Sequence, residues 1–264
     1  MGGTKLLVID VGNTNIVLGV FQGTTLGAQW RLASSRERTA DEYGILVRDL
    51  FALEKLPISD VSGIMIASVV PPLNFALAEM ARKYFRIEPV FLEPGTRTGM
   101  AILCDTPQEV GADRIADAVA AYEKYGGPCV VLDFGTAITF DVISKKGEYL
   151  GGAIAPGIGI AAEALFERTA KLPRVEIREP EHVIGTNTVN SIQSGIFYGT
   201  VASVDGILDR LAAELGKEMK VIATGGQAPL IAGASKYKPP IDPSLTLEGL
   251  RIIYERNRSV ARRK

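Results

Sequence analysis

The stretch KLLVIDVGNTNIVLGVF, residues Lys5–Phe21, has the pattern of a strand, a tight polar turn and a second strand. Its apolar runs, Lys5–Ile9 and Ile16–Phe21, are both of strand length and rich in Val, Ile and Leu. Most of the residues between them are Asp, Gly, Asn and Thr, which favour turns. The stretch therefore predicts two neighbouring strands joined by a short turn.

The same pattern returns in CVVLDFGTAITFDVI, residues Cys129–Ile143. Here the apolar run Cys129–Leu132 leads into a glycine-containing turn and then into Ile138–Ile143. The aspartates that open the two turns, Asp10 and Asp133, lie about half the chain length apart. A unit repeated at that distance predicts two related halves rather than one continuous sheet.

Segments with helical spacing alternate with strand-length runs along the rest of the chain, which is typical of an α/β protein. Helices are predicted over Asp41–Leu53, Leu73–Tyr84 and Asp113–Tyr125. We expect a first domain over residues 1–124 and a second over residues 125–264. A C-terminal helix, Leu247–Tyr254, is expected to pack back on the first domain.

The composition argues against several classes of protein. The 264 residues include 29 basic and 30 acidic side chains, so no net field would draw the chain to nucleic acid or to an anionic membrane. The longest apolar stretches, such as Ile64–Val70, are far shorter than the roughly 20 residues that a membrane span needs. The first residues lack the pattern of a secretory signal, and Cys104 and Cys129 do not suggest a disulfide scaffold. We expect a cytoplasmic protein that binds neither nucleic acid nor membranes.

The first turn, Asp10–Asn15, has the composition of a phosphate-binding loop. Its successive backbone N–H groups can point at a polyphosphate, and Gly12 has no side chain to block close approach. Asn13 and Thr14 add neutral donors, and Asp10 can hold a hydrated Mg²⁺ that bridges the phosphates. One such turn is a common structural hairpin, so its recurrence is the observation that indicates a nucleotide site.

The second turn, Asp133–Ala137, offers a carboxylate at Asp133 and a hydroxyl at Thr136. A third glycine turn, Thr224–Gln227, follows a short predicted strand, and its missing side chains would let adenine or ribose lie against the backbone. No Walker-type Gly-x-x-x-x-Gly-Lys-Ser/Thr sequence occurs, and no Gly-x-Gly-x-x-Gly opens a helix after a strand. The nucleotide site is therefore of another kind.

Three motifs, in this order, resemble those of the actin-like ATPase superfamily: DVGNTN at Asp10–Asn15, DFGTA at Asp133–Ala137 and TGG at Thr224–Gly226. Within that superfamily, the intervening segments resemble type III pantothenate kinases. These segments are WRLASSRERTADEYG (Trp30–Gly44), SVVPPL (Ser68–Leu73), EVGADRIAD (Glu109–Asp117), GGAIAPGI (Gly151–Ile158) and IGTNTVNSIQSGIFYG (Ile184–Gly199). The resemblance covers nearly the whole chain, up to a C-terminal tail at Arg256–Lys264.

The resemblance implies an α/β fold of two related actin-like (ribonuclease H-like) domains that flank a nucleotide cleft. It implies phosphorylation of pantothenate with ATP to 4′-phosphopantothenate, the first step of coenzyme A biosynthesis. It also implies Mg²⁺ held indirectly by Asp10, a monovalent cation (K⁺ or NH₄⁺) at Asp133, and a homodimer. The ATP contacts that it implies are Asp10, Val11, Gly12, Asn13, Thr14, Asn15, Thr136, Gly225 and Gly226.

The same resemblance places the substrate site on Gly111-Ala112-Asp113-Arg114, with a further contact from Thr188. Asp113 would be the general base for the pantothenate hydroxyl, and Arg114 would receive the pantothenate carboxylate. Elementary chemistry agrees, because an alcohol nucleophile needs a nearby proton acceptor and a substrate carboxylate needs a side chain that keeps its positive charge. Without the resemblance, Asp113 would be interpreted as a carboxylate that favours a helix N-terminus, and Thr188 as a helix N-cap.

The chain departs from the family pattern at Cys104. Type III pantothenate kinases often have a tyrosine at this place, seven positions before the glycine that opens Gly111–Arg114. The substitution either remodels the pantothenate pocket or is compensated by a neighbouring residue. It bears on substrate affinity and not on the class of reaction.

Three alternatives stay open at this point. Another small-molecule kinase of the superfamily would keep Asp10, Asp133 and the glycine turns but change the surroundings of Asp113. A non-catalytic nucleotide-binding accessory factor of transcription would not need the intact Asp113 and Arg114. An actin-like filament protein would need a polymerising surface, which the sequence does not reveal.

Overall fold

Both strand–turn–strand patterns form antiparallel pairs. β1 (Lys5–Val11) pairs with β2 (Asn15–Gln22), and β7 (Cys129–Phe134) pairs with β8 (Ala137–Ile143). The strands are longer than the apolar runs alone predict, because pairing continues into the polar residues beside each turn. Asp10 and Asp133 are therefore strand residues next to a turn, and not turn residues.

The computed structural model describes residues 4–216 and 218–261. Its chain divides into two compact units. Unit 1 combines Met1–Met100, Asp105–Ala120 and Leu245–Lys264, and unit 2 combines Ala101–Cys104 with Ala121–Ser244. The chain thus passes more than once between the units.

Unit 1 is built on a five-stranded sheet of order β3-β2-β1-β4-β5. β4 runs parallel to β1 and to β5, whereas β2 is antiparallel to β1 and to β3. The remaining strands and the helices are β3 (Thr25–Ala33), β4 (Val61–Ser68), β5 (Val90–Phe91), α1 (Ala40–Leu53), α2 (Pro71–Met80), the start of α3 (Ala112–Tyr125), α7 (Leu245–Ala261) and the short 3₁₀ turns Ile58–Asp60 and Pro107–Glu109.

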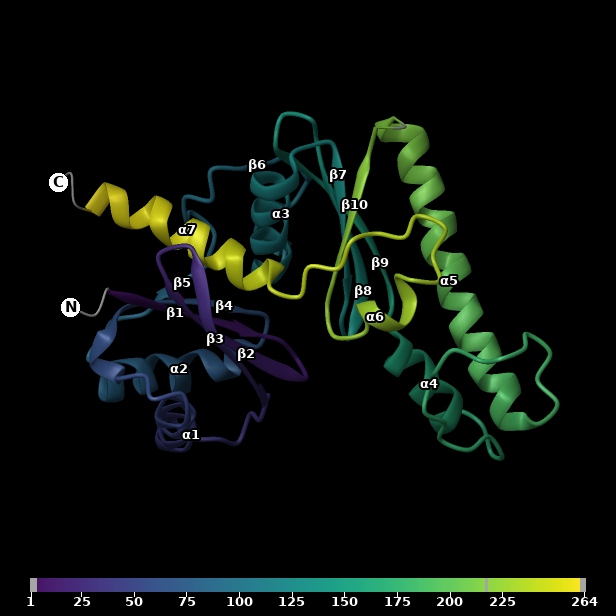
Figure 1. Ribbon diagram of the computed structural model, residues 1–264, viewed down its shortest axis with the longest axis horizontal. Helices are drawn as coiled ribbons and strands as arrows, with labels where there is room; N and C mark the ends of the chain where they lie inside the picture. The colour runs from purple at the N-terminus through teal and green to yellow at the C-terminus, as the bar shows by residue number, and fades with distance from the viewer. Residues whose placement is uncertain (1–3, 217, 262–264) are drawn as a thin grey trace. The chain divides into compact units, whose positions relative to one another are not determined.

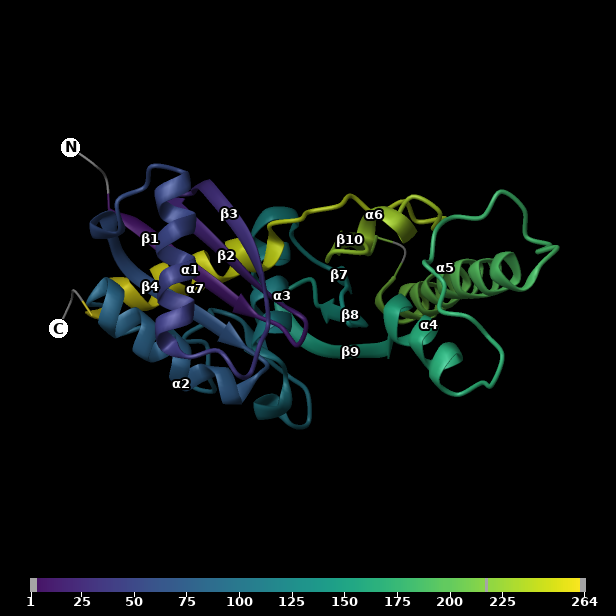
Figure 2. The same cartoon turned by 90° about the horizontal axis from the view of Figure 1, so that it is seen from below.

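The two faces of the unit 1 sheet are covered by different helices (Figures 1 and 2). Alternate β1 side chains point to opposite faces. Leu7, Ile9 and Val11 pack in one core with residues of α1 and α2. The other face packs against α7, where Gly19 of β2 leaves room for Leu247. Residues from both ends of the chain thus build one domain.

The helices of unit 1 begin where local capping dictates. Thr39 caps α1, and Thr39 and Glu42 form a capping box in which each side chain bonds the backbone of the other. The predicted start of α2 at Leu73 was wrong, because the helix begins at Pro71, whose fixed φ suits the first helical turn. Beyond Met80 the chain continues as a π-helical turn, Ala81–Phe85.

Unit 2 is built on a second five-stranded sheet, of order β10-β7-β8-β9-β6. One face of this sheet packs on α5, which lies along it in Figure 1. Val130, Leu132 and Phe134 of β7 share that core with Ile196 and Phe197 of α5. The further elements are β6 (Ala101–Ile102), β9 (Glu148–Pro156), β10 (Lys220–Thr224), α4 (Ile158–Glu167), α5 (Thr188–Leu215) and α6 (Ala228–Ile231).

None of the helices in the described part of the chain is long and apolar enough to cross a membrane.

Candidate functional site

The first phosphate motif forms a closed turn at one end of the unit 1 sheet. The backbone N–H of Gly12 donates to the carbonyl of Asn15 at 2.9 Å, which closes the reversal between β1 and β2. Asn13 and Thr14 are exposed at its tip, whereas Asp10 is half-buried in the part of β1 next to the turn. Backbone N–H groups of turns are donors of the kind that can bind phosphate oxygens.

The Gly111–Arg114 segment lies beside this turn in the same unit. The pairing of β4 with β1 continues one residue beyond the end of β4, where the Val69 N–H donates to the Val11 carbonyl at 3.0 Å. The side chain of Val69 in turn lies against Gly111, because a Cβ added to this glycine would be 3.6 Å from Val69 Cγ1. One backbone hydrogen bond and one side-chain contact therefore connect the end of β1 to the start of α3.

Asp113 is the second residue of α3, and its carboxylate turns back toward the helix start. Its Oδ1 accepts a hydrogen bond from the backbone N–H of Arg114 at 2.8 Å. A side chain at Gly111 would collide with this oxygen, since its Cβ would lie 2.4 Å away. Burial raises the pKa of Asp113 above its ordinary value of 3.8, and the hydrogen bond from Arg114 and the Arg114 charge oppose that rise only in part. A carboxylate whose proton affinity is raised in this way is suited to accept a proton.

The second phosphate motif and the glycine turn after β10 pack together in unit 2. The Gln227 N–H donates to the Phe134 carbonyl at 3.1 Å, so the two turns are hydrogen-bonded. Gly225 has φ +91°, and a Cβ there would lie 2.2 Å from Oδ1 of Asp133. Only glycine fits this place, because both the backbone conformation and the adjacent carboxylate exclude a side chain.

One aspartate precedes each of the two phosphate turns. Asp10 and Asp133 are both half-buried and lie next to a turn. Among the residues that the structure describes, no three His, Cys, Asp or Glu side chains form a metal-binding group. A single carboxylate suits a cation that takes most of its ligands from phosphates, backbone and water.

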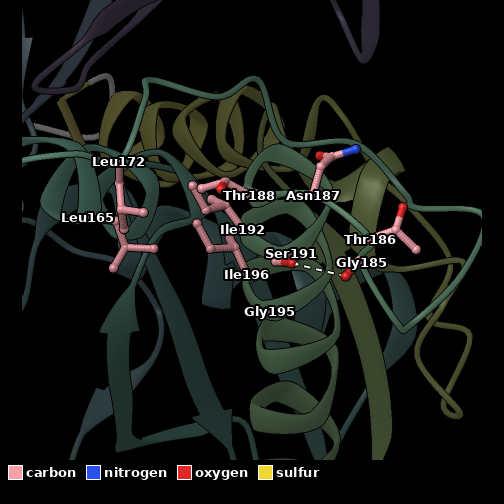
Figure 3. Close-up of a pocket in the computed structure, with 10 residues that line it drawn as sticks. All are labelled: Leu165, Leu172, Gly185, Thr186, Asn187, Thr188, Ser191, Ile192, Gly195 and Ile196. Atoms are coloured by element: carbon pink, nitrogen blue, oxygen red, sulfur yellow. Dashed lines mark hydrogen bonds between the residues drawn. The ribbon is translucent and has the colours of Figure 1, made fainter.

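Thr188 lies in a pocket of about 620 Å³ in unit 2, between α4 and the first turns of α5. Leu165 and Leu172 form one side of this pocket, and the polar Thr186 and Asn187 lie toward the other (Figure 3). The interpretation of Thr188 as an N-cap was wrong, because Asn187 caps α5 by accepting from the Asn190 N–H at 2.9 Å. Thr188 is the first helical residue, and its side chain is exposed.

Comparison with known proteins identifies the family. A family model described as type III pantothenate kinase matches residues 6–210. A type III pantothenate kinase of Koribacter versatilis (strain Ellin345) is 57% identical over an alignment of 269 positions, which covers 98% of this chain and 98% of the relative. The chain belongs to the type III pantothenate kinase family. The family resemblance noted in the sequence is confirmed, and with it the expectation of an ATP-dependent kinase that phosphorylates pantothenate.

Solved structures of low sequence identity share the fold. The ethanolamine utilization protein EutJ of Carboxydothermus hydrogenoformans superposes with a TM-score of 0.58 at 14% identity, covering 96% of this chain and 91% of that chain. An inorganic polyphosphate/ATP-glucomannokinase of Arthrobacter sp. strain KM gives a TM-score of 0.50 at 16% identity, covering 96% of this chain and 100% of that chain. The expected actin-like α/β fold is confirmed.

The residues that the family pattern singles out are divided between unit 1 and unit 2. Unit 1 holds the first phosphate turn together with Gly111, Ala112, Asp113 and Arg114. Unit 2 holds the second phosphate turn packed on Gly225, and it also contains Thr188 and the half-buried free thiol of Cys104. Sequence reasoning missed Ser34, which hydrogen-bonds the first phosphate turn, and Val69, which connects that turn to Gly111. The pair of serines, Ser34 and Ser35, after the segment Thr25–Ala33 was the only signal for Ser34.

Replacement of Gly225 by alanine tests the packing of the two turns in unit 2. We expect Gly225→Ala to weaken ATP binding at least ~10-fold, because the new Cβ must displace the Asp133 carboxylate or the turn. Gly233→Ala is the matched control, since nothing lies within 4 Å of its Cβ position. Calorimetric titration with ATP and Mg²⁺ gives both affinities, and unchanged binding in Gly225→Ala would contradict the description of this site.

Proposed function

We propose that this kinase transfers the γ-phosphoryl group of ATP to the 4′-hydroxyl of pantothenate, with Asp113 as the general base. The observation that supports this assignment is the short path from the first phosphate turn through Val11 and Val69 to Gly111. It brings a phosphate-binding turn and a carboxylate of raised proton affinity into the same unit. These are the two parts that a phosphoryl transfer to an alcohol needs.

The transfer proceeds by in-line displacement at the γ-phosphorus. The 4′-oxygen of pantothenate forms the new P–O bond, the bond between the γ-phosphorus and the β,γ-bridging oxygen breaks, and ADP leaves. Asp113 accepts the hydroxyl proton as the new bond forms. Its contribution is on the order of 10²–10⁴ in rate, and positioning of the two substrates provides much of the remainder.

The ATP triphosphate is assigned to the two phosphate motifs. Its proposed contacts are the backbone of Asp10–Asn15 and the side chain of Thr136, which is exposed at the second turn. The adenosine is assigned to Gly225 and Gly226. Since glycine leaves the backbone uncovered at these places, a flat ring or a phosphate can approach closely.

Two cations complete the proposal. Asp10 would hold Mg²⁺ through water, and Asp133 would hold K⁺ or NH₄⁺ through its carboxylate. Bound at these places, the cations would neutralise charge on the triphosphate. The chain itself contributes the carboxylates and fixes their positions through the two antiparallel strand pairs.

Pantothenate is assigned to Gly111–Arg114, Cys104 and Thr188. The guanidinium of Arg114 is a permanent cation and can pair with the pantothenate carboxylate. Thr188 offers a hydroxyl in the pocket at the start of α5. Cys104 is a smaller residue than the tyrosine often found at this place in the family, and the substitution bears on the affinity for pantothenate.

The enzyme is proposed to act as a homodimer in the cytoplasm. Unit 2 exposes apolar side chains close to the Thr188 pocket, on α4, on the segment before α5 and on the first turn of α5. They are Ile160, Leu165, Phe166, Val183, Ile184 and Val189. Ile184 is 83% exposed, which is unfavourable in water and favours cover by a second copy of the chain.

Light scattering during size exclusion is expected to give twice the chain mass, and a monomer at micromolar concentration would refute the dimer.

The reaction itself is tested by ADP release from ATP and Mg²⁺. We expect turnover that depends on pantothenate and that is several-fold faster in potassium than in sodium buffer. Turnover that another alcohol supports better than pantothenate would indicate a different kinase of the fold. ATP binding without turnover would support a non-catalytic nucleotide-binding protein instead.

Asp113→Asn separates the catalytic role from a structural one. We expect turnover to fall by about 10²–10⁴ while ATP still binds. The raised pKa means that the folded state disfavours the ionised carboxylate, so this unfavourable contribution grows as pH rises through the pKa of Asp113. At neutral pH the uncharged asparagine removes it, and the Tm is expected to be unchanged or higher.

The pH dependence gives a further readout for the same variant. In the wild type, kcat/KM is expected to fall toward acid with an apparent pKa above 3.8, the ordinary value for Asp. A structural carboxylate at a helix N-terminus would give the opposite pattern, in which Asp113→Asn lowers the Tm and keeps most of the turnover.

A further inference from the structure

We propose that Ser34 is a positioning residue for the first phosphate turn and thereby for ATP. Ser34 follows directly on β3, the strand that pairs with β2. Its Oγ donates to the Gly12 carbonyl at 2.5 Å, and its backbone N–H donates to the Thr14 carbonyl at 3.0 Å. Two carbonyls of the turn are thus held by one residue from outside it. The inference rests on the proposed function, because it concerns the nucleotide that this turn binds.

The two contacts of Ser34 also fix the direction of backbone N–H groups in the turn, because the peptide bond is planar. A trans peptide is planar, so its N–H points opposite to its C=O. When Ser34 holds the Gly12 carbonyl, it also fixes the direction of the Asn13 N–H. When it holds the Thr14 carbonyl, it fixes the direction of the Asn15 N–H. The Gly12 N–H also bonds the Asn15 carbonyl within the turn, so four peptide planes have a hydrogen-bonded orientation before ATP arrives: 11–12, 12–13, 14–15 and 15–16.

Ser35, the residue after Ser34, is hydrogen-bonded to the first helix. The hydroxyl of Tyr43 on α1 donates to the Ser35 carbonyl at 3.0 Å and accepts from the Ser35 N–H at 3.4 Å. Tyr43 has no exposed surface and packs in the core between the sheet and α1. The end of β3 is therefore hydrogen-bonded to a residue of the buried core of unit 1. Ser34 in turn restricts the motion of the exposed turn through its two hydrogen bonds.

Preorganised donors bind an anion without first having to be ordered, so loss of the Ser34 hydroxyl should weaken ATP binding. The test compares Ser34→Ala with Ser34→Thr, which keeps a hydroxyl and suits a strand end. Ser35→Ala is the matched control, because Ser35 joins this network through backbone atoms that alanine retains. The readouts are the Kd for ATP with Mg²⁺ by calorimetry, KM for ATP, KM for pantothenate, and Tm.

We expect Ser34→Ala to raise the Kd and the KM for ATP about 3- to 10-fold, the range for one lost hydrogen bond. KM for pantothenate should stay within about twofold, and Ser34→Thr and Ser35→Ala should resemble the wild type. A folded Ser34→Ala protein with wild-type ATP affinity would overturn the proposal. So would equal increases in both KM values, since they would indicate a general structural role.

Tyr43→Phe provides a second test in case Ser34→Ala does not fold. It removes the hydroxyl that holds Ser35 and keeps the buried ring, so a smaller rise in the Kd for ATP is expected. An unchanged Kd in this variant would overturn the proposal if Ser34→Ala cannot be measured. The Kd for ATP does not require turnover, so a wild type that binds ATP without phosphorylating pantothenate would refute the proposed function while the role of Ser34 is still decided.

Discussion

The reversal of the chain between two buried antiparallel strands is the constraint on which the rest of the site depends. In β1 and β2 the register places Asp10 opposite Val17, and in β7 and β8 it places Asp133 opposite Thr139. Because side chains alternate between the faces of a sheet, a slip of one residue would move each aspartate to the other face. The buried apolar residues of each strand prevent that slip. The same hydrophobic packing that forms the sheet therefore fixes the carboxylates next to the phosphate turns.

Backbone hydrogen bonds hold most of the candidate site in place. The first phosphate turn is tied to β4 through Val11 and Val69, and to β3 through Ser34, while the second is tied to the turn after β10. Backbone hydrogen bonds between neighbouring strands are well suited to this role, because they set orientation as well as distance. Asp113 differs from these parts, since its burial disfavours the charged form that the proposed general base needs. Such local instability is expected of a group with the proposed catalytic role.

Much of this organisation was predictable from sequence, for physical reasons. Strand-length apolar runs, glycine turns and helical spacing predicted β1, β2, β7, β8 and α1 close to their observed bounds. The start of α2 was misplaced because the prediction put both prolines before the helix, although proline fits the first turn of a helix. The role of Ser34 could not be predicted, because a hydroxyl that bonds a carbonyl 22 positions away leaves no local pattern. Asn187 took the capping position expected of Thr188, since both residue types cap helices and only the backbone decides between them.

The identity of the phosphorylated product decides whether the enzyme phosphorylates the 4′-hydroxyl of pantothenate. The purified protein should be incubated with ATP, Mg²⁺, K⁺ and pantothenate, and the mixture followed by ³¹P NMR with proton correlation. We predict a new phosphomonoester signal that couples to the 4′-methylene protons of pantothenate and that grows in step with ADP. Formation of inorganic phosphate alone, or of a phosphate ester at any other hydroxyl, would contradict it.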